Sequence, residues 1–151
     1  ARVEAYGPQI RYREHDHGVR FQGIYQTNVA FRETRADYAL SHSDDDVFVP
    51  GAFDTIRALA TQHPQRPILF RCISPGGNPT WPDGKPELRR HKLGVGSLAC
   101  PRRYLKPYPG PIDGHDYYWV CECLALAAAD GKLPVWTDDI LMRGRNQERR
   151  T

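Results

Sequence analysis

The chain has 151 residues, of which 40% are hydrophobic and 26% are charged, and its formal net charge is +3. This composition is that of a globular domain and excludes an intrinsically disordered chain. The longest apolar run, over residues 117–129, is interrupted by Glu122. It is shorter than the roughly 20 residues of a membrane-spanning helix, so the sequence predicts no membrane span.

Three patterned segments lie in the first half of the chain. Apolar and polar residues alternate over 19–31 (VRFQGIYQTNVAF), which predicts a β-strand. Segment 34–41 (TRADYALS) predicts a short helix with its apolar residues on one side. Segment 51–62 (GAFDTIRALATQ) predicts a second helix. Pro64 ends that helix, because the residue before a proline avoids the α region.

Two apolar runs follow in the second half. Residues 67–73 (PILFRCI) form a short apolar run between a proline and a Ser-Pro-Gly-Gly turn, which predicts a buried strand. Residues 117–127 (YYWVCECLALA) are rich in aromatic and apolar side chains and predict the central strand of the sheet. The Asp-Gly pair at 130–131 predicts a hairpin turn into a further strand over 133–136.

The predicted fold class is therefore α+β, with a mostly antiparallel sheet and one or two short helices. Thirteen prolines and thirteen glycines cluster over 74–86 and 101–114, which predicts long Pro/Gly-rich loops. We expect a single globular domain over residues 1–142, followed by a basic C-terminal tail over 143–151.

The positive charge is concentrated in one stretch of the sequence. Segment 89–106 carries six cations and no acid, and the tail over 143–151 carries a net +3, so the rest of the chain is acidic. A basic strip on an acidic body predicts an anionic partner. The candidate partner-binding residues are Arg89, Arg90, Lys92, Arg102, Arg103, Tyr104 and Lys106.

Three functions are open for this basic strip. Docking on a protein or another anionic partner is the leading hypothesis. Nucleic-acid binding is an alternative, because Tyr104 and Tyr108 are interleaved with the cations and are suited to stacking on bases. A phosphate loop of the acetyltransferase type around Gly94 and Gly96 is disfavoured, because Pro101 interrupts the helix that should follow.

The spacing of the cysteines and histidines only weakly indicates a metal-binding site. Four cysteines in a chain large enough to form its own core do not indicate a secreted disulfide scaffold, which favours an intracellular location. Cys121 and Cys123 would share one face of the predicted strand, and this is poor geometry for zinc. We therefore favour buried thiols and expect no metal, with a disulfide or redox pair left open. His15 and His17 are a possible metal pair, with an exposed turn as the default.

One segment suggests an enzyme. Residues 23–39 (GIYQTNVAFRETRADYA) resemble the segment of ADP-ribosyltransferases in which a Gly-Ile-Tyr strand leads into a short helix. The resemblance implies an NAD-using transferase in which Tyr25 stacks on nicotinamide. It also implies that Glu122 or Asp116 polarises a ribose hydroxyl as the catalytic acid. Without that activity, Glu122 is expected to form a cross-strand ion pair with Arg71.

Taken together, these patterns predict a non-catalytic interaction or accessory subunit without a cofactor. It would dock on an anionic partner surface in a larger assembly through its basic, proline-rich loop. An NAD-dependent ADP-ribosyltransferase-like enzyme and a nucleic-acid-binding domain are the alternatives.

Overall fold

The computed structural model describes residues 24–42, 46–74, 76–82, 84–90, 93, 95–110 and 113–144. Three α-helices, five β-strands and two short 3-10 helices make up this part of the chain. In chain order they are α1 (Ile24–Glu33), β1 (Tyr38–Ala39), β2 (Asp46–Phe48), α2 (Ala52–Gln62), β3 (Ile68–Ile73), η2 (Val95–Ser97), β4 (Leu98–Pro101), η3 (Arg102–Tyr104), α3 (His115–Ala129) and β5 (Val135–Gly144).

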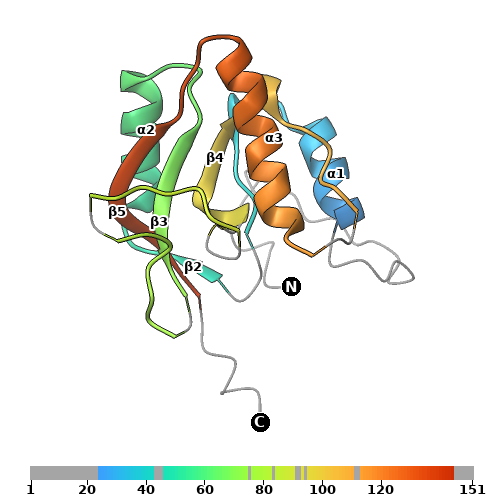
Figure 1. Ribbon diagram of the computed structural model, residues 1–151. Helices are drawn as coiled ribbons and strands as arrows, with labels where there is room; N and C mark the ends of the chain where they lie inside the picture. Colours follow the sequence, from blue (N-terminus) through green and yellow to red (C-terminus); the bar gives the residue numbers. More distant parts are fainter. Residues whose placement is uncertain are drawn as a thin grey trace, which may run out of the picture.

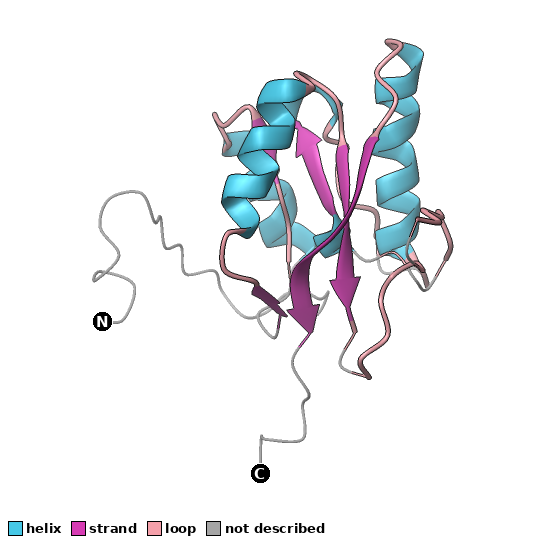
Figure 2. Cartoon of the chain, turned by 90° about the vertical axis from the view of Figure 1, so that its left-hand side faces the viewer, coloured by secondary structure: helices cyan, strands magenta, loops and turns pink. Residues whose placement is uncertain are grey.

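The five strands form one sheet in the order β1-β4-β3-β5-β2. Neighbouring strands are antiparallel except β3 and β5, which run parallel. Figure 2 shows that the strands are strongly twisted across one another. The α+β class and the mostly antiparallel sheet are confirmed, with three helices where the sequence predicts one or two.

Helices cover both faces of the sheet. Figure 1 shows α2 on one side, and α3 and α1 on the other. The core under α2 contains Ile56, Phe70 and Leu141. The core under α3 and α1 is larger and contains Leu69, Leu98 and Trp119. Successive residues of β3 therefore point to opposite cores, as the pleat of a strand requires.

Two of the predicted elements are confirmed. Helix α2 begins after Gly51, whose positive φ of 81° suits glycine, and it ends before His63. Its residues Ala52 and Ile56 are buried one turn apart. Strand β3 is buried over nearly its whole length and lies at the centre of the sheet, as its continuous apolar run predicts.

The predicted strand over 19–31 is wrong in the part that the structure describes, since residues from Ile24 to Glu33 form helix α1. Ile24 is buried and Phe31 packs against the same core, which places them two helical turns apart. Tyr25, which the strand pattern would bury, is 52% exposed. The alternation is imperfect, because Ile24 falls in its polar row and Thr27 in its apolar row, so it does not distinguish a period of 2 from a period of 3.6.

The predicted helix over 34–41 is also wrong. Tyr38 and Ala39 form the edge strand β1, which pairs with Cys100 and Pro101 of β4. The backbone N–H of Arg102 donates to the carbonyl of Asp37 at 2.9 Å. Pairing with a distant strand overrides the weak local helix propensity.

The run predicted as the central strand is helix α3. Its buried residues Trp119, Val120, Cys123, Leu124 and Ala127 follow helical spacing. A continuous apolar run has no period of its own, and a length of 15 residues favours a helix over a strand. No helix in the described segments combines the length and the apolar character that crossing a membrane requires.

The predicted hairpin turn at 130–131 is the C-terminal end of α3. The N–H of Lys132 donates to the carbonyl of Ala127 at 2.8 Å, and that of Gly131 to Ala128 at 2.9 Å. Gly131 has a φ of 70°, so these bonds form a Schellman cap. The chain then enters β5, which pairs with β3 in parallel and not as a hairpin.

Candidate anion-binding pocket

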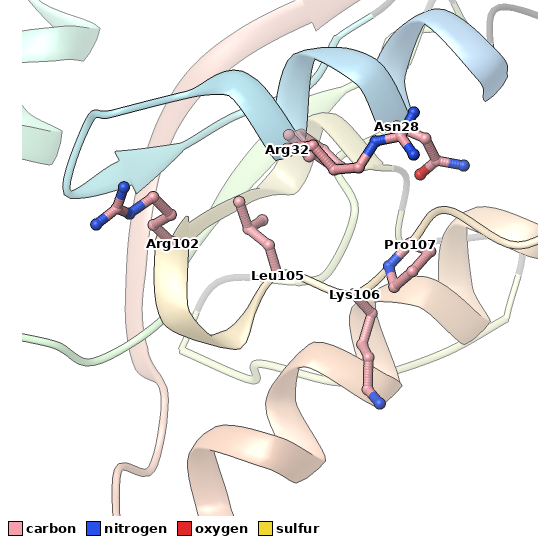
Figure 3. Close-up of a pocket in the computed structure, with 7 residues that line it drawn as sticks. Asn28, Arg32, Arg102, Leu105, Lys106 and Pro107 are labelled. Carbon is pink, nitrogen blue, oxygen red and sulfur yellow. The ribbon is translucent and has the colours of Figure 1, made fainter.

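A pocket of about 370 Å³ lies between α1 and the segment that follows β4 (Figure 3). We call it the basic pocket, and its lining residues are Asn28, Phe31, Arg32, Arg102, Leu105, Lys106 and Pro107. Three of these are cations and none is a carboxylate. None of the seven is fully buried, so the pocket is a surface depression.

Asn28 joins the two walls of the pocket. Its Nδ2 donates to the carbonyl of Tyr108 at 3.1 Å, and its Oδ1 accepts from the N–H of Tyr108 at 2.5 Å. The two residues are 80 positions apart in the chain. Because both polar atoms of the amide are used, Asn28 holds the walls together and is a positioning residue.

Trp119 supports the pocket from α3. Its Nε1 donates to the carbonyl of Lys106 at 2.9 Å, and its ring stacks on Phe31 with centroids 5.4 Å apart. Trp119 is fully buried. One core side chain therefore fixes both the backbone of the 102–107 segment and the apolar wall of α1.

The three cations form a rim around an apolar centre. In Figure 3, Arg102 and Lys106 extend to different sides of Leu105, while Arg32 approaches from α1. Arg102 donates to the carbonyl of Thr34 at 3.4 Å. Within the described part of the chain, no carboxylate forms an ion pair with Arg32, Arg102 or Lys106. The rim therefore carries three positive charges that these residues do not neutralise.

The other described cations of the basic strip are neutralised. Arg89 pairs with Glu87 at 2.8 Å, and Arg90 pairs with Asp113 at 2.5 Å. Arg90 also lies over the ring of Tyr118, 5.6 Å from its centroid.

Arg103 is the third neutralised cation. It contacts Asp130 at 3.9 Å, and its guanidinium covers the ring of Tyr104. We call Arg89, Arg90 and Arg103 the paired arginines. Lys92, also predicted to bind the partner, lies outside the described residues, as do residues 145–151 of the predicted basic tail.

The tyrosines of the strip are not available for stacking on a partner. Tyr104 is 3% exposed and Tyr108 is 8% exposed, although the sequence suggested exposed aromatic residues. Tyr104 donates its hydroxyl to Asp130 at 3.0 Å, and its ring lies in the core under α3. Burial and the Asp130 carboxylate both raise the pKa of Tyr104, so its hydroxyl stays protonated.

The two residues predicted to be catalytic lie on helices. Tyr25 is on α1 and Glu122 is on an exposed position of α3. The strands on which the ADP-ribosyltransferase resemblance places them are absent at these positions. Tyr25 instead shares a face of α1 with Asn28 and Arg32, at spacings of three and seven residues.

The predicted cross-strand ion pair between Arg71 and Glu122 is wrong, because Glu122 is on an exposed face of a helix. Arg71 is 7% exposed on β3 and donates to the carbonyl of Asp138 at 3.3 Å. The Asp138 carboxylate accepts hydrogen bonds from Trp81 and from the N–H of Gly84.

The cysteines are distributed over different parts of the fold. Cys72 lies in the core under α2, whereas Cys100 and Cys123 lie under α3. Cys121 is half-buried, and it does not share a face with Cys123 because the two are on a helix. All four are free thiols. Burial raises the pKa of Cys72 to about 12, so its thiol is protonated and unreactive at neutral pH.

The described ranges contain no group of three or more His, Cys, Asp or Glu side chains arranged to hold a metal ion. His15 and His17, the possible metal pair, lie outside those ranges. The sheet separates Cys72 from Cys100 and Cys123, so the four cysteines do not form one tetrahedral site.

Sequence reasoning found two of the three cations of the basic pocket. It identified Arg102 and Lys106 but missed Arg32 and Asn28, which come from the other wall of the pocket. Their spacing of one helical turn is a signal only once residues 24–33 are known to form a helix.

Comparison of the chain with protein-family models and with curated protein sequences finds no match.

Proposed function

We propose that the chain is a non-catalytic accessory domain that docks on an anionic surface of a partner protein through the basic pocket. One observation carries this proposal: Arg32, Arg102 and Lys106 line the same pocket, and no carboxylate lines it with them. Positive charge that the described residues leave uncompensated favours a negatively charged partner.

The shape of the pocket supports a macromolecular partner. Sites for free small molecules enclose most of the ligand surface. The basic pocket is lined by exposed and half-buried residues only, so a small ligand would remain largely in water. A partner protein can add contacts around the pocket, and Tyr25 is exposed on the same face of α1. Tyrosine and arginine are typical anchors of protein interfaces.

The apolar centre also supports a protein partner. Phe31, Leu105 and Pro107 contribute apolar surface between the cations. An acidic peptide that carries an apolar side chain matches both parts of the pocket.

A nucleic-acid track fits the structure less well. Such a track needs several cations along a backbone and aromatic rings on which bases stack. Glu87, Asp113 and Asp130 neutralise the paired arginines, which interrupts the positive charge along the strip. The side chains of Tyr104 and Tyr108 are buried. Among the described cations of the strip, those without a carboxylate partner, Arg102 and Lys106, both lie at the pocket.

Fluorescence anisotropy with a labelled acidic peptide that contains leucine tests this function. We expect the full chain to bind at about 0.15 M salt, and the double variant Arg32→Gln/Arg102→Gln to bind at least about tenfold more weakly. Each charge-assisted hydrogen bond lost is worth about 1.5–3 kcal/mol.

The matched control is Arg89→Gln/Arg90→Gln, which removes the same charge from the paired arginines. We expect this control to keep the affinity within about threefold, because these charges are already neutralised by neighbouring acids. Equal loss in both double variants would show that binding depends on net charge alone and would contradict the proposal.

A further inference from the structure

We infer that the basic pocket recognises a phosphorylated serine or threonine of the partner, next to an apolar residue. This inference rests on the proposed docking function and names the group that the pocket takes. Its support is the charge of the rim, the type of its donors and the apolar centre.

The charge of the rim fits a dianion better than a carboxylate. Arg32, Arg102 and Lys106 together carry three positive charges within one pocket of about 370 Å³. A phosphoserine or phosphothreonine carries a charge of about −1.5 to −2 at pH 7, whereas an aspartate or glutamate carries −1. A single carboxylate would leave most of the rim uncompensated.

The donors also fit a phosphate. A carboxylate has two oxygens, and the fork of one arginine is enough to occupy both. A phosphate ester has three terminal oxygens and can accept from more than one cation. Arg32 and Arg102 come from opposite walls, and both are exposed. To meet a group between them, Arg102 would exchange its long hydrogen bond to the carbonyl of Thr34, at 3.4 Å, for a bond to the phosphate. Lys106 adds a point charge from the same segment as Arg102.

The apolar centre specifies the neighbour of the phosphate. Phe31 is held against Trp119, with an angle of 15° between the rings, so its position does not depend on the ligand. Leu105 lies between Arg102 and Lys106 (Figure 3). An apolar side chain adjacent to the phosphorylated residue would pack on Leu105 and Phe31 while the phosphate meets the rim.

Three matched peptides test the inference with the full chain. They have one sequence with leucine after the variable position, which is phosphothreonine, glutamate or threonine. By anisotropy at pH 7.5, we expect the phosphopeptide to bind at least about tenfold more tightly than the glutamate peptide, and the threonine peptide to bind most weakly. If the phosphate and glutamate peptides bind equally, the phosphate inference is wrong while acidic docking stands.

A further double variant separates the effect of the guanidinium groups from the effect of the charge. Arg32→Lys/Arg102→Lys keeps all three charges but removes both guanidinium groups. We expect it to lower the affinity for the phosphopeptide about fivefold or more and to lower that for the glutamate peptide by a smaller factor, because a phosphate can use both forks and a carboxylate needs only one. Because both positions are exposed, the variant should fold normally, which thermal unfolding checks. Equal effects on the two peptides would overturn the role of the forks.

The pH dependence gives an independent readout. The second ionisation of the phosphate has a pKa of about 6, so lowering the pH from 7.5 to 5 converts most of the dianion to the monoanion. We expect the advantage of the phosphopeptide over the glutamate peptide to shrink across this range, because the monoanion keeps the oxygens but loses the second charge. An advantage that is unchanged between pH 7.5 and pH 5 would overturn the inference.

Two further outcomes would contradict the proposed peptide binding. If neither acidic nor phosphorylated peptide binds, the docking function itself is wrong. If single-stranded RNA binds more tightly than the phosphopeptide, and Arg32→Gln/Arg102→Gln abolishes that binding, the pocket is a nucleic-acid site and the peptide inference is overturned.

Discussion

The paired arginines and the pocket cations differ in what the fold places opposite them. Arg89, Arg90 and Arg103 each have a carboxylate within 4 Å. Arg102 and Lys106 come from the same basic strip but line a pocket with Arg32 and no acid. Adjacent residues such as Arg102 and Arg103 therefore lie in different electrostatic surroundings. If the proposed docking function is right, a charge of the strip should contribute to binding only where the described residues leave it uncompensated.

The largest expected effect comes from removing the support of the pocket. Trp119→Ala should lower the free energy of unfolding by about 3–5 kcal/mol, because it removes a fully buried indole. The stack on Phe31 and the hydrogen bond to Lys106 are lost with it. Urea unfolding measures the change. A loss below about 1 kcal/mol would contradict the packing described for this core.

Asn28→Ala breaks the connection between the pocket walls while leaving all three cations in place. We expect the free energy of unfolding to fall by about 1–3 kcal/mol, because the N–H and the carbonyl of Tyr108 lose their partner. Affinity for the acidic peptide should fall as well. Unchanged affinity would show that the charges act without the pocket geometry. Gln62→Ala, at an exposed position on α2, is the matched control.

Pro107→Glu would place a carboxylate beside the cations of the basic pocket, as the fold already does for the paired arginines. A carboxylate at this exposed lining position would be available to Arg32 or Lys106, so affinity for the acidic peptide should fall about tenfold, or about 1.4 kcal/mol. Anisotropy measures the loss. Pro50→Glu adds the same charge at an exposed position before α2 and should have little effect. Equal losses in the two variants would point to net charge as the cause.

The converse change has the smallest expected effect. Asp113→Asn removes the carboxylate from Arg90 and leaves the pocket intact. Because the pair is largely exposed, we expect the free energy of unfolding to fall by less than about 1 kcal/mol. Affinity for the acidic peptide should change by less than about threefold. A large gain in affinity would mean that Arg90 belongs to the docking surface after all.

The sequence predicted those elements whose signal is local. Helix α2 has an amphipathic pattern and a clear stop, and β3 is a short apolar run between turn residues. The segments of helices α1 and α3 predict strands instead, because an imperfect alternation and a mainly apolar run do not fix the period. Edge strand β1 depends on β4, which lies about 60 residues away, so no local pattern indicates it.

The candidate site could be predicted only in part, for a related reason. The sequence shows Arg102 and Lys106 as part of a basic strip over 89–106. The acids that neutralise the paired arginines lie outside that range, Glu87 just before it and Asp113 and Asp130 after it, so the local sequence overstates the positive charge of the strip in the fold. Arg32 joins the pocket through the contact between Asn28 and Tyr108, which only the folded chain reveals.

The most direct test of the central claim is an NMR titration of the full chain that follows the arginine Nε–Hε resonances. The labelled protein is mixed with the phosphothreonine peptide at pH 7.5, and Arg→Lys variants assign each signal. We predict that the signals of Arg32 and Arg102 shift and saturate with the peptide, while those of Arg89, Arg90 and Arg103 stay in place. Shifts of equal size at all five arginines, or at the paired arginines alone, would contradict the claim that the uncompensated cations of the pocket form the docking site.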